Sequence, residues 1–179
     1  EDVGVAKTDS ARRALTARNA EVDVVPITAR FDASNARALV RDYDVVLDAA
    51  DNFPTRYLVN DAAFLEGRCV VHGSVYLYEG QATVFDPEKG PCYRCLFPQP
   101  PAPGTVPSCA EAGVLGVLPG MIGVLQATEA IKLLTGLGDP LAGKLLLYDA
   151  LNMTFRTLQV KRHADCALCG NAPTIREAR

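Results

Sequence analysis

Four cysteines stand in two short pairs of the form Cys-x-x-Cys, a spacing that is typical of zinc ligands. The pairs are Cys92 with Cys95 and Cys166 with Cys169, and Gly170 follows the second pair, where it eases a tight turn. Four thiolates can close a tetrahedron around one zinc ion, which leaves no open position for catalysis. A redox Cys-x-x-Cys and two disulfides are the alternatives, but the coincidence of two pairs favours structural zinc. Because the pairs lie far apart in the chain, such a site would staple distant segments together.

Two carboxylates follow a short apolar run, at a point where the pattern predicts that a strand meets a helix. Residues 45–47 read Val-Val-Leu, as in a strand buried in a parallel sheet, and Asp48 and Asp51 come directly after them. Asn52 is suited to cap the following helix, and Pro54 to its first turn. In open α/β sheets ligands bind at the carboxyl ends of strands, so Asp51 can hold a metal that bridges to phosphate. A role of Asp51 and Asn52 as turn and cap residues alone fits the spacing equally well.

Four further side chains could have a chemical role, and each also has a purely structural interpretation. Cys109 ends a proline-rich segment, and an exposed thiol there is a candidate nucleophile, although the nearby carboxylate of Glu111 disfavours its thiolate. Lys7 opens a helical pattern, where a lysine is either solvated or reaches a phosphate. Cys69 lies within an apolar strand and is expected to be inert. His163 is a possible zinc ligand, but four cysteines suffice, so we expect a surface position.

Composition limits the class of protein. The 179 residues are 49% hydrophobic with a formal net charge of −3, which fits one globular domain with a substantial core. Lysine and arginine do not cluster in the sequence, so no basic patch for nucleic acid is predicted. No apolar run has the length of a membrane span. Paired cysteines with the spacing of metal ligands favour the cytoplasm over an oxidising compartment.

The elements that must position these residues alternate between strand and helix, which predicts an α/β, doubly wound sheet. The apolar patterns predict helices over 7–19, 34–41 and 122–134, and strands over 21–28, 45–47, 69–71, 79–85, 144–148 and 155–161. The strand over 79–85 alternates and is expected to be antiparallel, and the last two strands to form a hairpin. The helix over 122–134 is so apolar that we expect it to be largely buried. Residues 86–113 are rich in proline and are expected to form a long, mobile loop.

Five motifs occur in an order that resembles a known family. They are Asp-Val-Gly-x-x-Lys at 2–7, Leu-Asp-Ala-Ala-Asp-Asn-Phe-x-x-Arg-Tyr-Leu-x-Asn at 47–60, Gly-Ser at 73–74 with Gly-Gln at 80–81, the two cysteine pairs, and Gly-x-x-Pro-Gly at 116–120. Together they resemble the ubiquitin-activating-enzyme-like (ThiF/MoeB-type) adenylyltransferases of bacteria over nearly the whole chain. The molybdopterin-synthase and thiamine-biosynthesis types and their relatives in tRNA thiolation are the most similar branches.

The resemblance implies an enzyme that binds ATP and Mg²⁺ and adenylates the C-terminal glycine of a small ubiquitin-like sulfur-carrier protein. Lys7 resembles the phosphate-contacting lysine of the family, Asp51 its magnesium-binding aspartate, and Asn52 the neighbour of that aspartate at the nucleotide. Cys109 falls at a loop cysteine that bonds covalently to the carrier in some members. The four paired cysteines match the structural Zn²⁺ site. Members are typically homodimers, and a sulfurtransferase is a further candidate partner.

The sequence departs from the family in one respect. The glycine-rich nucleotide loop of the family, its ribose-binding acidic residue and its phosphate-clamping arginines precede the Asp-Val-Gly motif and do not occur in these residues. We therefore expect residues 1–179 to be the C-terminal two-thirds of one Rossmann-like adenylation domain, incomplete at its N-terminus and inactive by itself. A non-catalytic zinc-stabilised module that docks a carrier protein or partner subunit is the alternative. A related branch that activates a different carboxylate is a further one.

Overall fold

A computed structural model describes residues 2–102, 104–107 and 109–178, without the side chains of residues 109 and 110. The chain divides into two compact units, Glu1–Phe31 and Asp32–Arg179.

The first unit consists of one helix and an irregular segment. The helix, α1 (Lys7–Arg18), confirms the prediction over 7–19, and none of its side chains is buried. The strand predicted over 21–28 is wrong: these residues are irregular, and Val22 and Val25 are exposed. A strand exists only where a neighbouring strand accepts and donates its backbone hydrogen bonds, and no strand among the described residues pairs with this segment.

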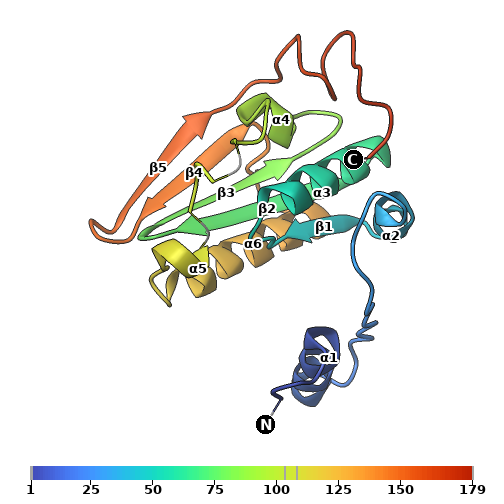
Figure 1. The fold of residues 1–179 in the computed structure, drawn as a ribbon, viewed down its shortest axis with the longest axis vertical. Helices are drawn as coiled ribbons and strands as arrows, with labels where there is room; N and C mark the ends of the chain where they lie inside the picture. The colour runs from blue at the N-terminus through green and yellow to red at the C-terminus, as the bar shows by residue number, and fades with distance from the viewer. Residues whose placement is uncertain (1, 103, 108, 179) are drawn as a thin grey trace. The chain divides into compact units, whose positions relative to one another are not determined.

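The second unit is built on a five-stranded mixed sheet (Figure 1). The strands lie side by side in the order β1 (Val45–Asp48), β2 (Cys69–Tyr76), β3 (Glu79–Phe85), β4 (Lys144–Asp149) and β5 (Thr154–Gln159). β1 and β2 are parallel, and every later pair is antiparallel. The α/β class, the antiparallel strand over 79–85 and the closing hairpin are therefore confirmed. The parallel, doubly wound character is limited to the first pair, and β2 extends well beyond the predicted 69–71.

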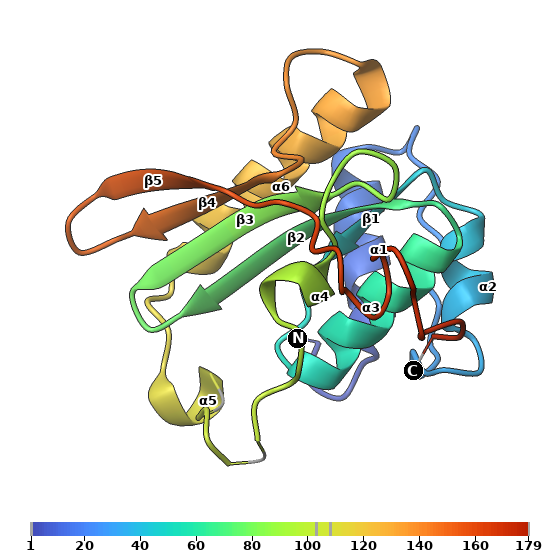
Figure 2. The same ribbon diagram turned by 90° about the horizontal axis from the view of Figure 1, so that it is seen from above.

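Helices cover both faces of this sheet, as Figures 1 and 2 show. The helices of this unit are α2 (Ala36–Arg41), α3 (Phe53–Leu65), α4 (Tyr93–Leu96), α5 (Cys109–Ala112) and α6 (Leu118–Thr135). α6 lies on one face, where Leu118 and Ile122 pack on Tyr148, and α3 with α4 lies on the other. Gly80 permits the close approach of α6, because a Cβ atom there would lie 2.5 Å from Cδ1 of Ile122. None of the described helices combines the length and hydrophobicity that a bilayer crossing requires.

The buried side of α6 carries two polar side chains beside its apolar ones, and several apolar side chains of the helix are exposed. The helix predicted over 122–134 is confirmed, but the expectation that it is largely buried is wrong. Nε2 of buried Gln126 donates to the carbonyl of Asp48 (2.8 Å), and Oε2 of buried Glu129 accepts from the backbone amide of Leu141 (2.7 Å). These two residues take inward positions because they satisfy backbone groups of neighbouring segments. An exposed apolar stripe remains on the outer side, formed by Val117, Met121, Val124, Ile131 and Leu134.

Candidate functional site

The junction between β1 and α3 presents Asp51 and Asn52 to solvent. Asn52 caps α3 as predicted, because its Oδ1 accepts a hydrogen bond from the backbone amide of Thr55 at 2.9 Å. Its Nδ2 donates to Oδ1 of Asp51 at 3.1 Å. Pro54 occupies the first turn of the helix, also as predicted. Asn52 therefore caps the helix and also orients the exposed carboxylate of Asp51, which remains available to a ligand.

Asp48, the other carboxylate of this junction, has a different environment. Its side chain is only 3% exposed. Oδ2 lies 2.7 Å from Nδ1 of His72, and Oδ1 accepts from the backbone amide of Ala50 at 2.9 Å. Both oxygens of Asp48 are therefore occupied inside the protein, and Asp51 is the carboxylate that a ligand can reach.

Arg56 braces the same junction one turn into α3. Its Nε and Nη2 donate to the carbonyl of Ala50 at 3.1 and 2.9 Å, and its Nη1 donates to Oγ of Ser74 on β2 at 2.7 Å. Sequence reasoning gave Arg56 no role. The available signal was its spacing of four residues from the Asn52 cap, which returns a helical side chain to the same side of the helix.

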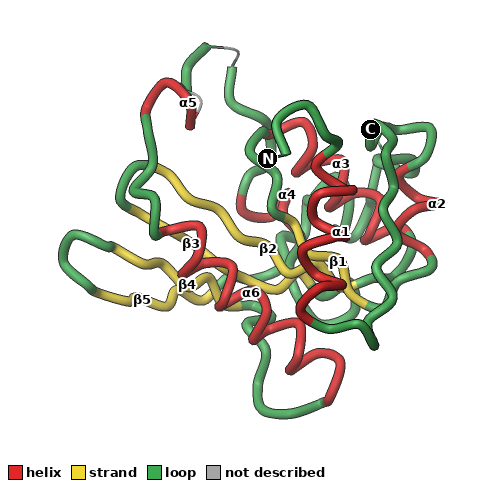
Figure 3. The backbone as a smooth tube through the Cα atoms, turned by 90° about the horizontal axis from the view of Figure 1, so that it is seen from below, coloured by secondary structure: helices red, strands yellow, loops and turns green. Residues whose placement is uncertain are grey.

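A cavity of about 520 Å³ opens at this junction. Asp51, Asn52 and Arg56 line one side of it. Other lining residues belong to the proline-rich segment over 86–113, namely Gly104, Val106, Pro107 and Glu111. Figures 2 and 3 show α5 of this segment lying away from the sheet. The volume lies in the range of small-molecule sites, and both acidic and basic side chains line the cavity.

Two further predicted residues of this site begin helices. Lys7 is exposed and begins α1 in the first unit. Cys109 begins α5, but its side chain lies outside the described part of the chain. Glu111 of the same helix lines the cavity.

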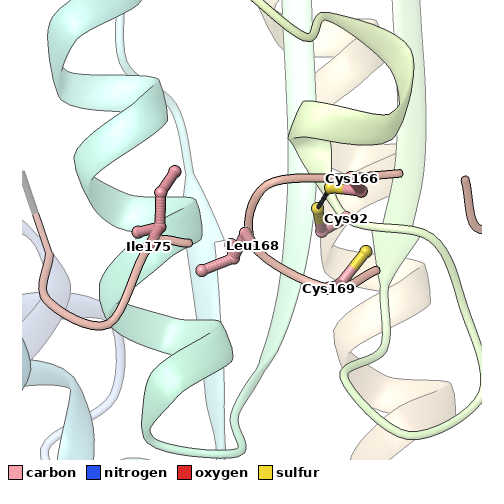
Figure 4. Packing of buried hydrophobic residues seen from close by; sticks show 5 residues of the cluster. All are labelled: Cys92, Cys166, Leu168, Cys169 and Ile175. Carbon is pink, nitrogen blue, oxygen red and sulfur yellow. Dashed lines mark hydrogen bonds between the residues drawn. The ribbon is translucent and has the colours of Figure 1, made fainter. Parts of the chain in front are cut away.

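The two cysteine pairs meet in one cluster, as predicted. The Sγ atoms of Cys92, Cys95, Cys166 and Cys169 all lie within 4.8 Å of one another, and Figure 4 shows three of them beside Leu168. Sγ of Cys95 lies 3.2 Å from that of Cys169, and Sγ of Cys92 lies 3.6 Å from that of Cys166. Four sulfurs bonded to zinc at about 2.3 Å are roughly 3.8 Å apart in a tetrahedron. The donor set and the spacing therefore fit one zinc ion, and the described cysteines form no disulfide.

Local contacts shape this cluster. The pKa of Cys95 is lowered because Cys169 and Cys92 hydrogen-bond to its sulfur, to which the backbone amide of His163 also donates at 3.3 Å. The imidazole of His163 is exposed, which confirms the predicted surface position. Gly170 is required by the turn, since a Cβ atom there would lie within 2.4 Å of a backbone carbonyl. The lowered pKa favours a thiolate at Cys95, and the glycine keeps the knuckle compact.

α3 joins the cysteine cluster to the Asp51 cavity. Oδ1 of Asn60 accepts from the backbone amide of Tyr93 at 2.7 Å. The guanidinium of Arg94 donates to both carboxylate oxygens of Asp61, at 2.7 and 2.6 Å. The helix that begins at the Asn52 cap therefore also holds the first cysteine pair. Sequence reasoning missed this contact, although Asn60 and Asp61 are polar residues within an otherwise apolar stretch.

Cys69 is half-buried at the start of β2, rather than within the core. Burial raises the pKa of its thiol. A raised pKa keeps the thiol protonated near neutral pH, which agrees with the expectation that Cys69 is inert.

Comparison with known proteins gives one family and closely similar relatives. The model of the ThiF family matches residues 1–168. The chain is 56% identical over 182 residues to the sulfur carrier protein adenylyltransferase of Thermus thermophilus, covering 99% of the chain and 67% of the relative. It is 51% identical over 175 residues to the adenylyltransferase and sulfurtransferase MOCS3 of Sus scrofa, covering 97% of the chain and 38% of the relative. The chain thus spans about two-thirds of one relative and less than half of the other.

A solved structure shares the fold. The crystal structure of E. coli MccB with MccA-N7isoASN matches with a TM-score of 0.79 at 20% identity, covering 94% of this chain and 53% of that one. This likeness confirms a Rossmann-like α/β fold.

Proposed function

The chain belongs to the ThiF family, and we propose that the protein containing it adenylates the C-terminal glycine of a small ubiquitin-like sulfur-carrier protein. The carboxylate of the carrier attacks the α-phosphate of ATP, an acyl–phosphate bond forms, and pyrophosphate leaves. The observation that carries this proposal is the cavity at the end of β1, where the exposed carboxylate of Asp51 and the guanidinium of Arg56 face one space. The activity of the relative from Thermus thermophilus supports the same reaction.

Asp51 is the residue that we assign to Mg²⁺, because carboxylate oxygens are preferred ligands of that ion. Bound magnesium supplies positive charge against the charge that develops on the phosphates. Asn52 keeps the Asp51 carboxylate oriented by donating to its Oδ1. Arg56 is held by Ala50 and Ser74, so its cation is already in place beside the cavity before a phosphate arrives. Lys7 is proposed as a second phosphate contact on the basis of the family motif.

Cys109 is the proposed acceptor of the activated carrier. Its thiolate would attack the acyl carbon of the adenylate, so that a thioester bond forms and AMP leaves. The position of α5 supports this role, because Glu111 of that helix lines the cavity. An adduct on Cys109 that hydroxylamine cleaves would be the product of this step.

Zinc has a structural role in this proposal. The four thiols supply a complete tetrahedral set, which leaves no position for a substrate. The segment of the first cysteine pair is held to α3 through Asn60 and Asp61, so zinc would stabilise the helix that begins at the cavity. Binding free energy at a site of this kind is also folding free energy.

We also propose that two copies of the protein associate through α6. The exposed apolar stripe along that helix supports this assembly, because a two-fold interface places the same surface of both copies in contact. A sulfurtransferase is a proposed further partner, as the name of the MOCS3 relative suggests. A cytoplasmic location is proposed because thiolate ligands persist in reducing compartments.

The test is ATP–pyrophosphate exchange by the natural protein that contains this chain, with a carrier ending in Gly-Gly. Exchange should require the carrier, and Asp51→Ala should abolish it with little change in stability, because Asp51 is exposed. Asp139→Ala, which removes an exposed carboxylate outside the cavity, should leave exchange unchanged. Exchange by Asp51→Ala at the wild-type rate would refute the assignment of Asp51.

A further inference from the structure

His72 is a buried histidine on β2, two residues before Ser74 of the cavity lining, and no step of the proposed reaction uses it. Its side chain is 1% exposed, and its ring packs against those of Phe85 and Tyr93, at centroid distances of 5.7 and 5.3 Å. Nδ1 contacts Oδ2 of Asp48 at 2.7 Å, whereas Nε2 has no hydrogen-bond partner among the described residues. A half-satisfied buried polar group is costly, and an apolar side chain at this position would avoid that cost.

The contact of His72 leads directly to the turn that carries Asp51. Oδ1 of Asp48 accepts from the backbone amide of Ala50, which shapes the start of the β1–α3 connection. The carbonyl of Ala50 then accepts from Arg56. The next residue along the chain is Asp51. His72 therefore contacts the Asp48 carboxylate, which in turn holds the backbone of this short turn.

We infer that His72 is a positioning residue, which acts through Asp48 to fix the turn that presents the Asp51 carboxylate to the cavity. The inference rests on the proposed function, since it assumes that Asp51 binds Mg²⁺. Without a donor from position 72, Oδ2 of Asp48 becomes a buried acceptor with no partner in that direction. Asp48 then rotates or recruits water, and the amide of Ala50 loses its fixed acceptor. Asp51 consequently samples positions that bind the ion less well.

Two amide substitutions distinguish the loss of the hydrogen bond to Asp48 from the loss of the imidazole ring. The amide nitrogen of Asn is as many bonds from Cα as Nδ1 of histidine, so His72→Asn retains a donor toward Asp48. The amide nitrogen of Gln corresponds to Nε2, so His72→Gln places its donor where the structure has no partner. His163→Gln is the matched control, because His163 is exposed and is the second of the two histidines in the chain.

The experiment measures the Mg²⁺ concentration that gives half-maximal ATP–pyrophosphate exchange in the natural protein. His72→Gln should raise it about tenfold, the order expected for a partner that orients a metal ligand. His72→Asn and His163→Gln should leave it close to the wild-type value. Unchanged Mg²⁺ dependence in His72→Gln, or an equal increase in His72→Asn, would overturn the role of His72. Absence of exchange in the wild-type protein would instead refute the proposed function.

A second measurement uses the wild-type protein, and so does not require that His72→Gln folds. The buried Nδ1–H of His72 should give a slowly exchanging imidazole proton resonance in NMR, which His72→Asn identifies by its loss. Addition of Mg²⁺ and ATP should shift this resonance, because the turn that carries Asp51 becomes engaged. The shift should be absent from Asp51→Asn. A resonance that is insensitive to Mg²⁺ and ATP would contradict the coupling.

Discussion

Replacing Arg94 by alanine should strongly destabilise the protein, because the change leaves a buried carboxylate without its cation. The Asp61 side chain is 0% exposed and that of Arg94 is 12% exposed, and two hydrogen bonds of 2.6 and 2.7 Å join them. Removing one partner of such a pair costs about 3–5 kcal/mol. The Arg94 guanidinium also lies 4.8 Å from the ring centroid of Tyr57, a contact worth about 0.5–2 kcal/mol.

This loss is a large part of the roughly 5–15 kcal/mol by which domains are stable. The assay is equilibrium urea unfolding followed by circular dichroism, with zinc present throughout. Arg41→Ala is the control, because Arg41 also pairs with a carboxylate, that of Glu66, but is exposed and should lose much less. The double variant Asp61→Leu, Arg94→Met should recover most of the stability, since it leaves no uncompensated buried charge. A loss below about 1 kcal/mol in Arg94→Ala, within the range of exposed pairs, would refute this reasoning.

Three further predictions concern zinc, assembly and pH. Metal analysis should find about one zinc per chain. The Cys95→Ser variant should lose this zinc and show faster hydrogen exchange over 86–113. A wild-type protein without zinc would contradict the proposed zinc site. Val124→Asp should convert a dimer to a monomer in sedimentation, whereas an unchanged mass would exclude α6 from the interface. Hydrogen bonds from Arg41 and Arg37 lower the pKa of Glu66 from 4.5 to about 2. Its stabilising contribution should therefore be complete above about pH 4.5 and lost as the pH falls toward 2, so the difference in unfolding free energy between wild type and Glu66→Gln should shrink over that range.

The features that could be predicted from the sequence depend on local or strongly constrained chemistry. The Asn52 cap and the first-turn Pro54 are set by residues within one helical turn. The meeting of Cys92 with Cys166 was predictable across a long separation, because the coincidence of two such pairs favours a shared metal ion. The antiparallel strand over 79–85 followed from its alternation of apolar and polar residues.

The features that could not be predicted depend on partners that the local pattern does not name. The apolar residues over 21–28 look like a strand, but a strand also needs a hydrogen-bonded neighbour. The periodicity of α6 defines its two sides but does not tell which side faces the sheet. Gln126 faces inward because its Nε2 donates to backbone carbonyls there. Asp48 and Asp51 look alike in sequence, but in the fold Asp48 is buried against His72 on the neighbouring strand whereas Asp51 is exposed. Arg56 was missed because its acceptors, Ala50 and Ser74, come together only in the fold.

The most direct test of the proposed adenylation is the intact mass of a Gly-Gly carrier protein after incubation with ATP, Mg²⁺ and the natural protein that contains this chain. The carrier should gain the mass of one adenylyl group, pyrophosphate should be released in step, and Asp51→Ala should give neither product. A carrier of unchanged mass in the presence of the folded, zinc-loaded wild-type protein, without pyrophosphate release, would contradict the proposed adenylation.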